Sequence, residues 1–194
     1  RLIAGQTNNL NKNVTIDIKS LSLKDYKKFL DETLKNKRKK YTAIDLFSGC
    51  GGLSLGFESV GFDVKGFEMD KDCCETSNMN LKGTTFNEKL NLKSNYGKCD
   101  VLIGGPPCQP FSVGGKQLGL KDSRDGFPIF LDAVKKTKPK LLLIENVRGL
   151  LYRNKNYLIE IIKEFEKLQY NVEYKLINAS HFYVPQNRFR LFIV

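Results

Sequence analysis

Short apolar runs alternate with amphipathic segments along the chain from residue 41 onward. Runs typical of buried strands occupy residues 41–47, 62–70, 84–90, 99–105, 139–147, 171–179 and 189–194. Helices are predicted between them, over residues 53–60, 71–80, 127–138 and 154–169. The helix at 154–169 has the clearest signature, because Leu158, Ile161 and Phe165 fall on one face. This alternation predicts an α/β fold with a mostly parallel sheet, helices on both faces, and ligands at the carboxyl ends of the strands.

Residues 1–40 have a different pattern. Residues 14–18 alternate like a short strand, and residues 21–37 predict an amphipathic helix with Ser22 as its cap. The basic run at 35–40 is interpreted as a solvated helix end and linker rather than as a DNA-binding arm. We therefore expect an N-terminal extension, residues 1–40, with a helix and a basic linker, followed by a main domain, residues 41–194.

The net charge of +11 favours a polyanionic partner, most simply nucleic acid. A Lys- and Asn-rich composition from an AT-rich genome would produce the same excess, so the charge alone does not decide. No apolar run approaches the ~18 residues of a membrane span, and no membrane partner is expected. The five cysteines are odd in number and form no CxxC pair, which disfavours disulfides and a metal site and favours a reducing compartment.

Two of the predicted strands end in residues that suit a nucleoside. The glycines of DLFSGCGG, residues 45–52, allow a tight turn and a close approach of the backbone to a ligand. Glu68 closes the next strand, 19 residues beyond Gly49, where α/β folds that bind nucleosides contact the ribose hydroxyls. Because the spacing is GxGG rather than GxGxxG, a nucleoside without a pyrophosphate fits better than a dinucleotide. A plain glycine turn with a surface glutamate is the alternative.

Two further strands end in candidate catalytic groups. GGPPCQPFS, residues 104–112, surrounds Cys108 with three prolines in a loop that follows a strand. A thiol in such a loop is either a reactive group that needs activation or a packing residue, and the motif alone leaves both open. Glu145 ends the strongly apolar run KLLLIENV, where a carboxyl group can act as a general acid or can simply terminate a strand.

Together these motifs resemble one family, the cytosine-C5 DNA methyltransferases, which use S-adenosylmethionine. The resemblance runs from about Tyr41 to Val194 and comprises, in the family's order, DLFSGCGG, FEMD, GGPPCQPFS, DSRDG, ENV and PQNRFR. It implies a Rossmann-like S-adenosylmethionine-dependent methyltransferase fold and transfer of a methyl group to C5 of cytosine in DNA. RNA cytosine-C5 methyltransferases use other cysteine motifs, except for a transfer-RNA branch that shares the DNA-type ones.

The resemblance implies four catalytic residues. Cys108 is expected to add to C6 of a cytosine that has been flipped out of the duplex. Glu145 is expected to contact N3 and the exocyclic amine, while Arg188 and Arg190 match a basic pair that orients the base. The expected partner is therefore double-stranded DNA with a target cytosine, and its phosphates would attract the positive charge.

The resemblance also implies a site for S-adenosylmethionine. Glu68 is expected to bind the ribose hydroxyls, and Met69, in place of the family's usual aromatic residue, to lie against the adenine. The family's Asp after the third strand meets the adenine amine, and here Asn87 and Glu88 are the candidates. The residues expected to contact the cofactor are Phe47, Ser48, Gly49, Cys50, Gly51, Gly52, Glu68, Met69, Glu88 and Pro106.

Members of the family continue past FRLFIV into a target-recognition region and a final segment beside DLFSGCGG. Neither follows Val194, and the chain begins with Arg1 rather than Met. We therefore expect a truncated, split or permuted gene, with target recognition on a downstream region or a second chain. The sequence predicts the catalytic domain of a bacterial, cytoplasmic restriction-modification methyltransferase. A transfer-RNA methyltransferase and a non-catalytic nucleic-acid-binding module are the alternatives.

Overall fold

The computed structural model describes residues 41–107 and 125–194, which belong to one compact unit beginning at Lys39. The strand and helix expected within residues 1–40, and the basic run at 35–40, lie outside the described residues. The strands are β1 (Thr42–Leu46), β2 (Asp63–Glu68), β3 (Thr84–Asn87), β4 (Val101–Gly104), β5 (Leu141–Val147), β6 (Tyr174–Asn178) and β7 (Phe189–Ile193). The helices are α2 (Gly52–Ser59), α3 (Lys71–Asn80), α4 (Phe127–Thr137), α5 (Gly149–Tyr152), α6 (Lys155–Lys167) and the 3₁₀ turn η3 (Ala179–Phe182).

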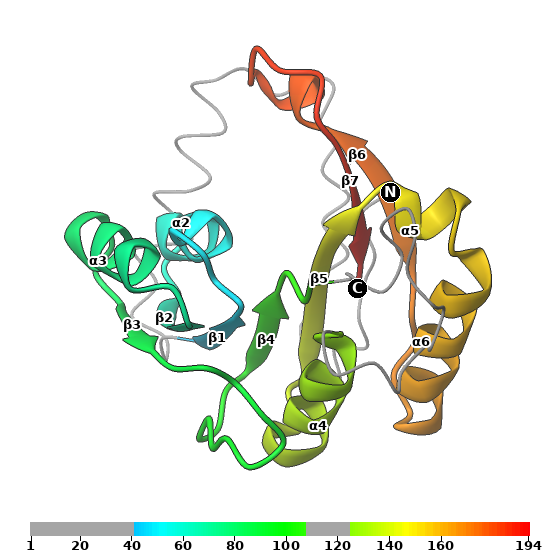
Figure 1. Ribbon diagram of the computed structural model, residues 1–194, viewed down its shortest axis with the longest axis horizontal. Coiled ribbons are helices and arrows are strands. Elements are labelled where there is room, and N and C mark those ends of the chain that lie inside the picture. Colours follow the sequence, from blue (N-terminus) through cyan, green and yellow to red (C-terminus); the bar gives the residue numbers. More distant parts are fainter. Residues whose placement is uncertain (1–40, 108–124) are drawn as a thin grey trace, which may run out of the picture. The chain divides into compact units, whose positions relative to one another are not determined.

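The strands form one sheet in the order β3-β2-β1-β4-β5-β7-β6 (Figure 1). The first five strands pair in parallel, and β7 runs antiparallel to both β5 and β6. The predicted, mostly parallel α/β sheet is confirmed. The order of the strands reverses between β1 and β4, which makes the carboxyl ends of these two strands the topological switch point where such sheets bind ligands.

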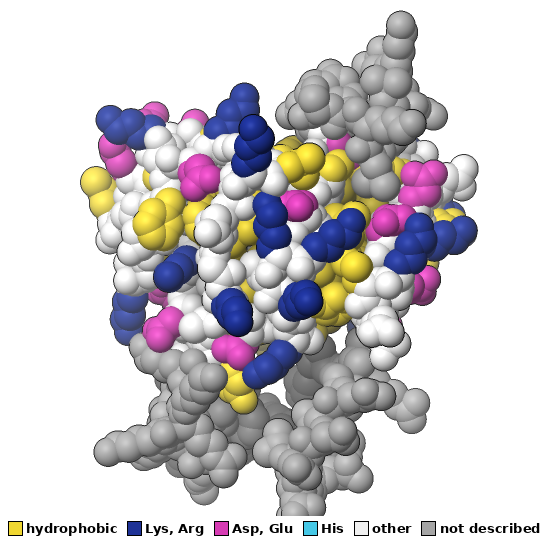
Figure 2. All heavy atoms as spheres, turned by 90° about the horizontal axis from the view of Figure 1, so that it is seen from below, with side chains coloured by type: hydrophobic (Ala, Val, Ile, Leu, Met, Phe, Trp, Pro, Cys, Tyr) yellow, Lys and Arg dark blue, Asp and Glu magenta, His cyan; other side chains and the backbone are white. Residues whose placement is uncertain are grey.

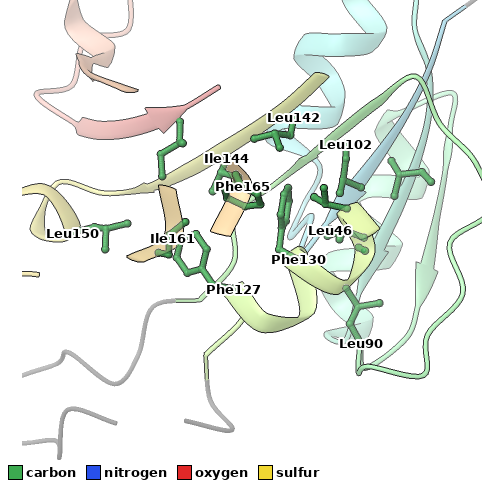
Figure 3. Packing of buried hydrophobic residues seen from close by; sticks show 14 of the residues in the cluster. Leu46, Leu90, Leu102, Phe127, Phe130, Leu142, Ile144, Leu150, Ile161 and Phe165 are labelled. Atoms are coloured by element: carbon green, nitrogen blue, oxygen red, sulfur yellow. The ribbon is translucent and has the colours of Figure 1, made fainter. Parts of the chain in front are cut away.

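Helices cover both faces of the sheet, as predicted. On one face, the buried side chains of Leu46, Leu102 and Ile144 pack against Phe130 of α4 and Phe165 of α6 (Figure 3). The opposite face is smaller and is covered by α2. Its buried residues are Ala43, Val64, Val101 and Ile103, with Leu53 and Phe57 of α2 packed against them. The Rossmann-like layer arrangement therefore follows from apolar residues on both sides of each central strand.

Several boundaries differ from the sequence prediction. The run at 62–70 ends as a strand at Glu68, because the side chain of Asp70 caps α3 by accepting from Cys73 N at 2.9 Å. The run at 84–90 ends at Asn87, and Leu90 leaves the sheet to pack into the core. Neither α5 nor η3 was predicted, since four residues are too few to show a period. No helix of residues 41–107 and 125–194 has the length and apolar character needed to cross a membrane.

Candidate active site

The loop after β1 has the sharp turn that its glycines predict. Phe47, Gly49 and Gly51 all have left-handed backbone, with φ of 58°, 54° and 87°. A Cβ on Gly51 would lie 2.5 Å from Leu81 Cδ1 and 2.7 Å from Ser77 Oγ, so a larger residue would displace these side chains as well as strain the left-handed backbone. A Cβ on Gly49 would meet nothing within 4 Å. Open space therefore remains beside the backbone of Gly49, where a ligand can approach closely.

The other residues of this loop are divided between the loop's support and its surface. Ser48 N donates a hydrogen bond to Phe67 O at 3.1 Å, which ties the loop to β2. The Ser48 hydroxyl is buried and has no partner among the described residues. Cys50 is exposed, and Gly52 begins α2 with no atom within 4 Å of an added Cβ. The loop thus presents Cys50 and Gly52 outward while Ser48 is turned inward.

The carboxylate of Glu68 holds three backbone N–H groups together at the end of β2. Its Oε2 accepts from Gly49 N at 2.9 Å, which connects it to the glycine loop. Its Oε1 accepts from Met69 N at 2.8 Å and from Asp70 N at 2.9 Å. The Met69 side chain is 68% exposed and available to a ligand. Glu68 therefore lies between the loop and the start of α3, as its spacing from Gly49 predicts.

The two candidates after β3 have different surroundings. Asn87 Nδ2 donates to Glu68 O at 3.2 Å and to Met69 O at 2.9 Å, so its amide supports the turn before α3. Glu88 Oε1 accepts from Ser94 Oγ at 2.8 Å. Its other carboxylate oxygen, Oε2, has no hydrogen-bond partner among the described residues. Of the two, Glu88 therefore retains an acceptor for a ligand amine.

Asp45 is a fully buried acid beneath the loop, and the sequence analysis did not select it. Its Oδ2 accepts from Ser54 N at 3.1 Å and from Ser54 Oγ at 2.6 Å, which secures the first turn of α2. Burial raises the pKa of Asp45 to about 6, against the lowering effect of the Ser54 hydrogen bonds, and the negative charge of Glu68 raises it further. An acid inside an apolar strand is the sequence signal that could have identified it.

Residues 104–107, after β4, are held from two sides. Asn146 Nδ2 at the end of β5 donates to Pro106 O at 3.0 Å, and Gly126 N donates to Pro107 O at 2.9 Å. A Cβ on Gly126 would lie 2.5 Å from Pro107 Cδ and 2.9 Å from Pro106 Cβ, so a side chain there would displace the prolines. Cys108 lies outside the described residues, but the two residues that precede it are fixed.

The residue before Gly126 anchors this arrangement to the core. Asp125 is 3% exposed, and its carboxylate accepts from Phe127 N at 3.0 Å and from the Tyr157 hydroxyl of α6. Asp125 and Gly126 close the DSRDG motif, whose first three residues lie outside the described part of the chain. Sequence analysis assigned Tyr157 no role, because its position in the helix pattern is also that of a core residue.

Glu145 and Arg190 form an ion pair at the same edge of the sheet. Arg190 Nε lies 2.8 Å from Glu145 Oε1, and the two side chains are 23% and 26% exposed. A Cβ on Gly105 would lie 3.6 Å from Glu145 Oε2, so this carboxylate also borders the loop after β4. Arg188 is exposed just before β7 and makes no ion pair within residues 41–107 and 125–194. The structure thus brings Arg190, but not Arg188, to Glu145.

A cleft of about 530 Å³ lies between Val147, at the end of β5, and α5. Its lining includes Arg148, Tyr152 and Arg153. The Arg148 guanidinium lies 5.9 Å from the centroid of the Phe189 ring, and Tyr152 is 67% exposed. Exposed aromatic rings among arginines are typical of surfaces that bind nucleic acid.

The positive charge is unevenly distributed along the chain. Residues 1–40 contain eleven Lys and Arg against four Asp and Glu, whereas residues 41–107 contain six against nine. Residues 125–194, which carry Glu145, Arg190 and the cleft, contain twelve against seven. On the face in Figure 2, Lys and Arg are spread among Asp and Glu. Within the described residues, the positive excess therefore lies in residues 125–194 and not in residues 41–107.

The carboxyl edge of the sheet collects most of the predicted site residues. Those at this edge are Phe47, Ser48, Gly49, Cys50, Gly51, Gly52, Glu68, Met69, Glu88, Pro106, Glu145 and Arg190. Asp45, Asn146, Asp125 and Tyr157 support them and were not predicted. The arrangement joins a nucleoside-sized turn with a carboxylate–guanidinium pair beside the fixed loop that leads to a cysteine.

Comparisons with known proteins identify the family to which the chain belongs. A family model described as C-5 cytosine-specific DNA methylase matches residues 41–194. The Type II methyltransferase M.AplI of Arthrospira platensis is 47% identical over 173 residues, which cover 87% of this chain and 50% of that protein. The Type II methyltransferase M.FnuDI of Fusobacterium nucleatum is 42% identical over 156 residues, 78% of this chain and 45% of that protein. The chain spans about half the length of these curated relatives.

Solved structures show the same fold. A structure from E. coli assigned as a prophage DNA modification methyltransferase matches with a TM-score of 0.63 at 30% identity, over 79% of this chain and 46% of that one. The Dnmt2 methyltransferase of S. pombe matches with a TM-score of 0.62 at 20% identity, over 79% of this chain and 50% of that one. At 20% identity the second likeness concerns the fold alone.

Proposed function

Because the chain belongs to the C-5 cytosine-specific DNA methylase family, we propose that it carries the catalytic half of a Type II DNA cytosine-C5 methyltransferase of a restriction-modification system. The observation that supports this most is the Glu145–Arg190 pair, which stands next to the loop that leads to Cys108. A carboxylate held by a guanidinium beside a nucleophile is the set of groups that cytosine activation requires.

Cys108 is the proposed nucleophile. Its thiolate forms a bond to C6 of a flipped cytosine, and the electron pair of the C5–C6 double bond moves into the ring toward N3. The carboxyl group of Glu145 donates a proton to N3 as negative charge develops there and accepts a hydrogen bond from the exocyclic amine, while Arg190 keeps the group in place. After C5 has been methylated, loss of its proton restores the C5–C6 double bond and expels the Cys108 thiolate.

The residues after β1, β2 and β3 fit S-adenosylmethionine, which is a nucleoside with free ribose hydroxyls and no phosphate. Glu68 accepts one N–H on Oε2 and two on Oε1, so a lone pair on Oε2 remains for a hydroxyl. Open space beside Gly49, the exposed Met69 and the free oxygen of Glu88 suit the rest of the nucleoside. When bound, S-adenosylmethionine supplies an electrophilic methyl group.

Double-stranded DNA is the proposed substrate. The arginine-lined cleft at α5 begins at Val147, two residues after Glu145 on β5, where phosphates next to a flipped base would pass. Recognition of the target sequence is assigned to a further region or a second chain, because the curated relatives are about twice as long as their match to this chain.

Covalent trapping tests this function. The full-length gene product is incubated with cofactor and with duplex DNA that carries 5-fluorocytosine, whose C5 has no proton to lose after methylation. We expect a protein–DNA adduct that survives denaturing electrophoresis and is absent from Cys108→Ser. Trapping on a transfer-RNA substrate but not on DNA would assign the activity to RNA. Tight DNA binding with no adduct on either substrate would refute the proposed enzymatic activity and indicate that the protein is a nucleic-acid-binding module.

A further inference from the structure

Two thiols meet at the candidate cofactor site, and the chemistry described above uses neither as a reactive group. Cys50 Sγ, on the glycine loop after β1, lies 3.5 Å from Cys73 Sγ in the first turn of α3. Cys50 is exposed and Cys73 is half-buried. The spacing of 23 residues is outside any local cysteine motif, so the fold alone brings the two together. We propose that Cys50 and Cys73 are a modification site, an oxidisable dithiol that peroxides convert to a disulfide across the cofactor site.

The geometry favours this pair over the other described cysteines. A disulfide has an S–S length of about 2.05 Å, so the two sulfurs must approach by roughly 1.5 Å. The Cys50 backbone stands next to Gly49, where open space allows such a movement. Cys74 is buried, and its thiol donates to Glu68 O at 3.4 Å. Burial raises the pKa of the Cys99 thiol to about 11, which keeps it in the unreactive protonated form.

The two cysteines have different parts in the reaction. The exposed Cys50 thiolate attacks one oxygen of the peroxide and becomes a sulfenic acid, while the other oxygen leaves as water. Cys73 then attacks the Cys50 sulfur and expels the second oxygen as water, so the dithiol loses two electrons to the peroxide. Cys50 is exposed whereas Cys73 is half-buried, so a peroxide in solution reaches Cys50 first and Cys73 is the second thiol to react.

The disulfide would join the glycine loop after β1 to the first turn of α3, and the Glu68 carboxylate already contacts both segments. Gly49 N, next to Cys50, and Asp70 N, three residues before Cys73, both donate to the Glu68 carboxylate. A cross-link draws the loop toward α3 over this carboxylate. This part rests on the proposed function, because it takes the Glu68 site to be where S-adenosylmethionine binds. Oxidation then lowers affinity for the cofactor, and by the same linkage a bound cofactor makes formation of the disulfide less favourable.

Peptide mapping tests the dithiol independently of any activity. The full 194-residue chain is treated with hydrogen peroxide, its remaining thiols are alkylated, and the digest is analysed by mass spectrometry. We expect a Cys50–Cys73 linked peptide that dithiothreitol removes, in wild type and in the matched control Cys99→Ser. The linked peptide should be absent from Cys73→Ser. Oxidation of Cys50 to a sulfinic acid in the wild type, without a link to Cys73, would refute the proposal.

Calorimetry with S-adenosylhomocysteine tests the effect on the cofactor site. We expect the oxidised wild type to bind at least about tenfold more weakly than the reduced protein, and dithiothreitol to restore the affinity. Oxidant should leave the affinity of Cys73→Ser unchanged. If the disulfide forms and the affinity stays the same, the effect on the site is refuted. Failure of the reduced protein to bind at all would instead count against the proposed cofactor, and the mapping result would still stand.

Discussion

Glu145 and Arg190 meet between β5 and β7, with Oε1 and Nε 2.8 Å apart. The pair forms because β7 runs antiparallel to β5, with Val147 opposite Arg190, so the start of β7 lies at the carboxyl end of β5. Both side chains are about three-quarters buried, which limits the screening of their attraction by water. The guanidinium thus fixes the carboxylate that the proposed reaction presents to cytosine.

Replacing Arg190 should lower the catalytic rate of the full-length enzyme. We expect Arg190→Leu to reduce kcat by a factor of roughly 10²–10³, the usual cost of removing one preorganised electrostatic partner. The kcat of Arg190→Lys should lie between those of the wild type and Arg190→Leu, because lysine keeps the charge but not the guanidinium geometry. Lys163→Leu, which removes an exposed charge from α6, should retain the rate. Single-turnover methylation measures the effect. A rise in KM for DNA with kcat intact would instead make Arg190 a phosphate contact.

Glu68→Gln should weaken cofactor binding. A glutamine has one acceptor oxygen, so its NH₂ group would face one of the N–H donors that the carboxylate now accepts. We expect the Kd for S-adenosylhomocysteine to rise by about 10- to 100-fold, as for a lost charge-assisted hydrogen bond. Calorimetry would measure it, with Glu75→Gln on the exposed side of α3 as the control. Equal affinities in the two variants would remove Glu68 from the site.

The sequence predicted the strands and helices because each central strand is apolar and each long helix is amphipathic. It placed Glu68 correctly beside Gly49, since both follow neighbouring parallel strands. It could not show that β7 reverses direction, because an antiparallel strand has the same pattern as a parallel one. For that reason Arg188 and Arg190 looked equivalent, although only Arg190 reaches Glu145. The sequence also could not show that Asn146 and Asp125 hold the segments on either side of the Cys108 loop, because tertiary hydrogen bonds leave no periodic signal.

Gly126→Ala should destabilise the loop before Cys108. The added Cβ would lie 2.5 Å from Pro107 Cδ and 2.9 Å from Pro106 Cβ, so the prolines or α4 must move. We expect a loss of about 1–3 kcal/mol in the free energy of unfolding, measured by urea denaturation. Gly56→Ala is the matched control, because its Cβ meets nothing within 4 Å and alanine favours the helix by up to ~1 kcal/mol. Similar stabilities for the two variants would contradict the close contact.

Asp45 should make stability depend on pH in the direction opposite to an ordinary paired acid. Its pKa is raised from 3.8 to about 6 in the fold, so the folded state holds a proton that the unfolded state has released between these values. The free energy of unfolding therefore falls as pH rises through this window. Relative to wild type, Asp45→Asn should gain about 2–3 kcal/mol between pH ~4 and pH ~7.

Urea denaturation across this pH range would measure the difference, and Asp70→Asn supplies a control of opposite sign. The Cys73 backbone N–H lowers the pKa of Asp70, so the wild type should gain stability over Asp70→Asn as pH rises through acid values. An Asp45→Asn difference that stays constant with pH would show that Asp45 is ionised throughout.

Glu145 and Asn146 are adjacent on β5, so their side chains emerge on opposite faces of the sheet. One contacts Arg190, and the other holds the carbonyl of Pro106, two residues before Cys108. A displacement of β5 therefore moves the Glu145 carboxylate and the Pro106 carbonyl, which Asn146 holds, by the same amount. The separation of the Glu145 carboxylate and the Pro106 carbonyl is thus set by two neighbouring residues of one strand, which makes it insensitive to movements of the helices that pack around the sheet.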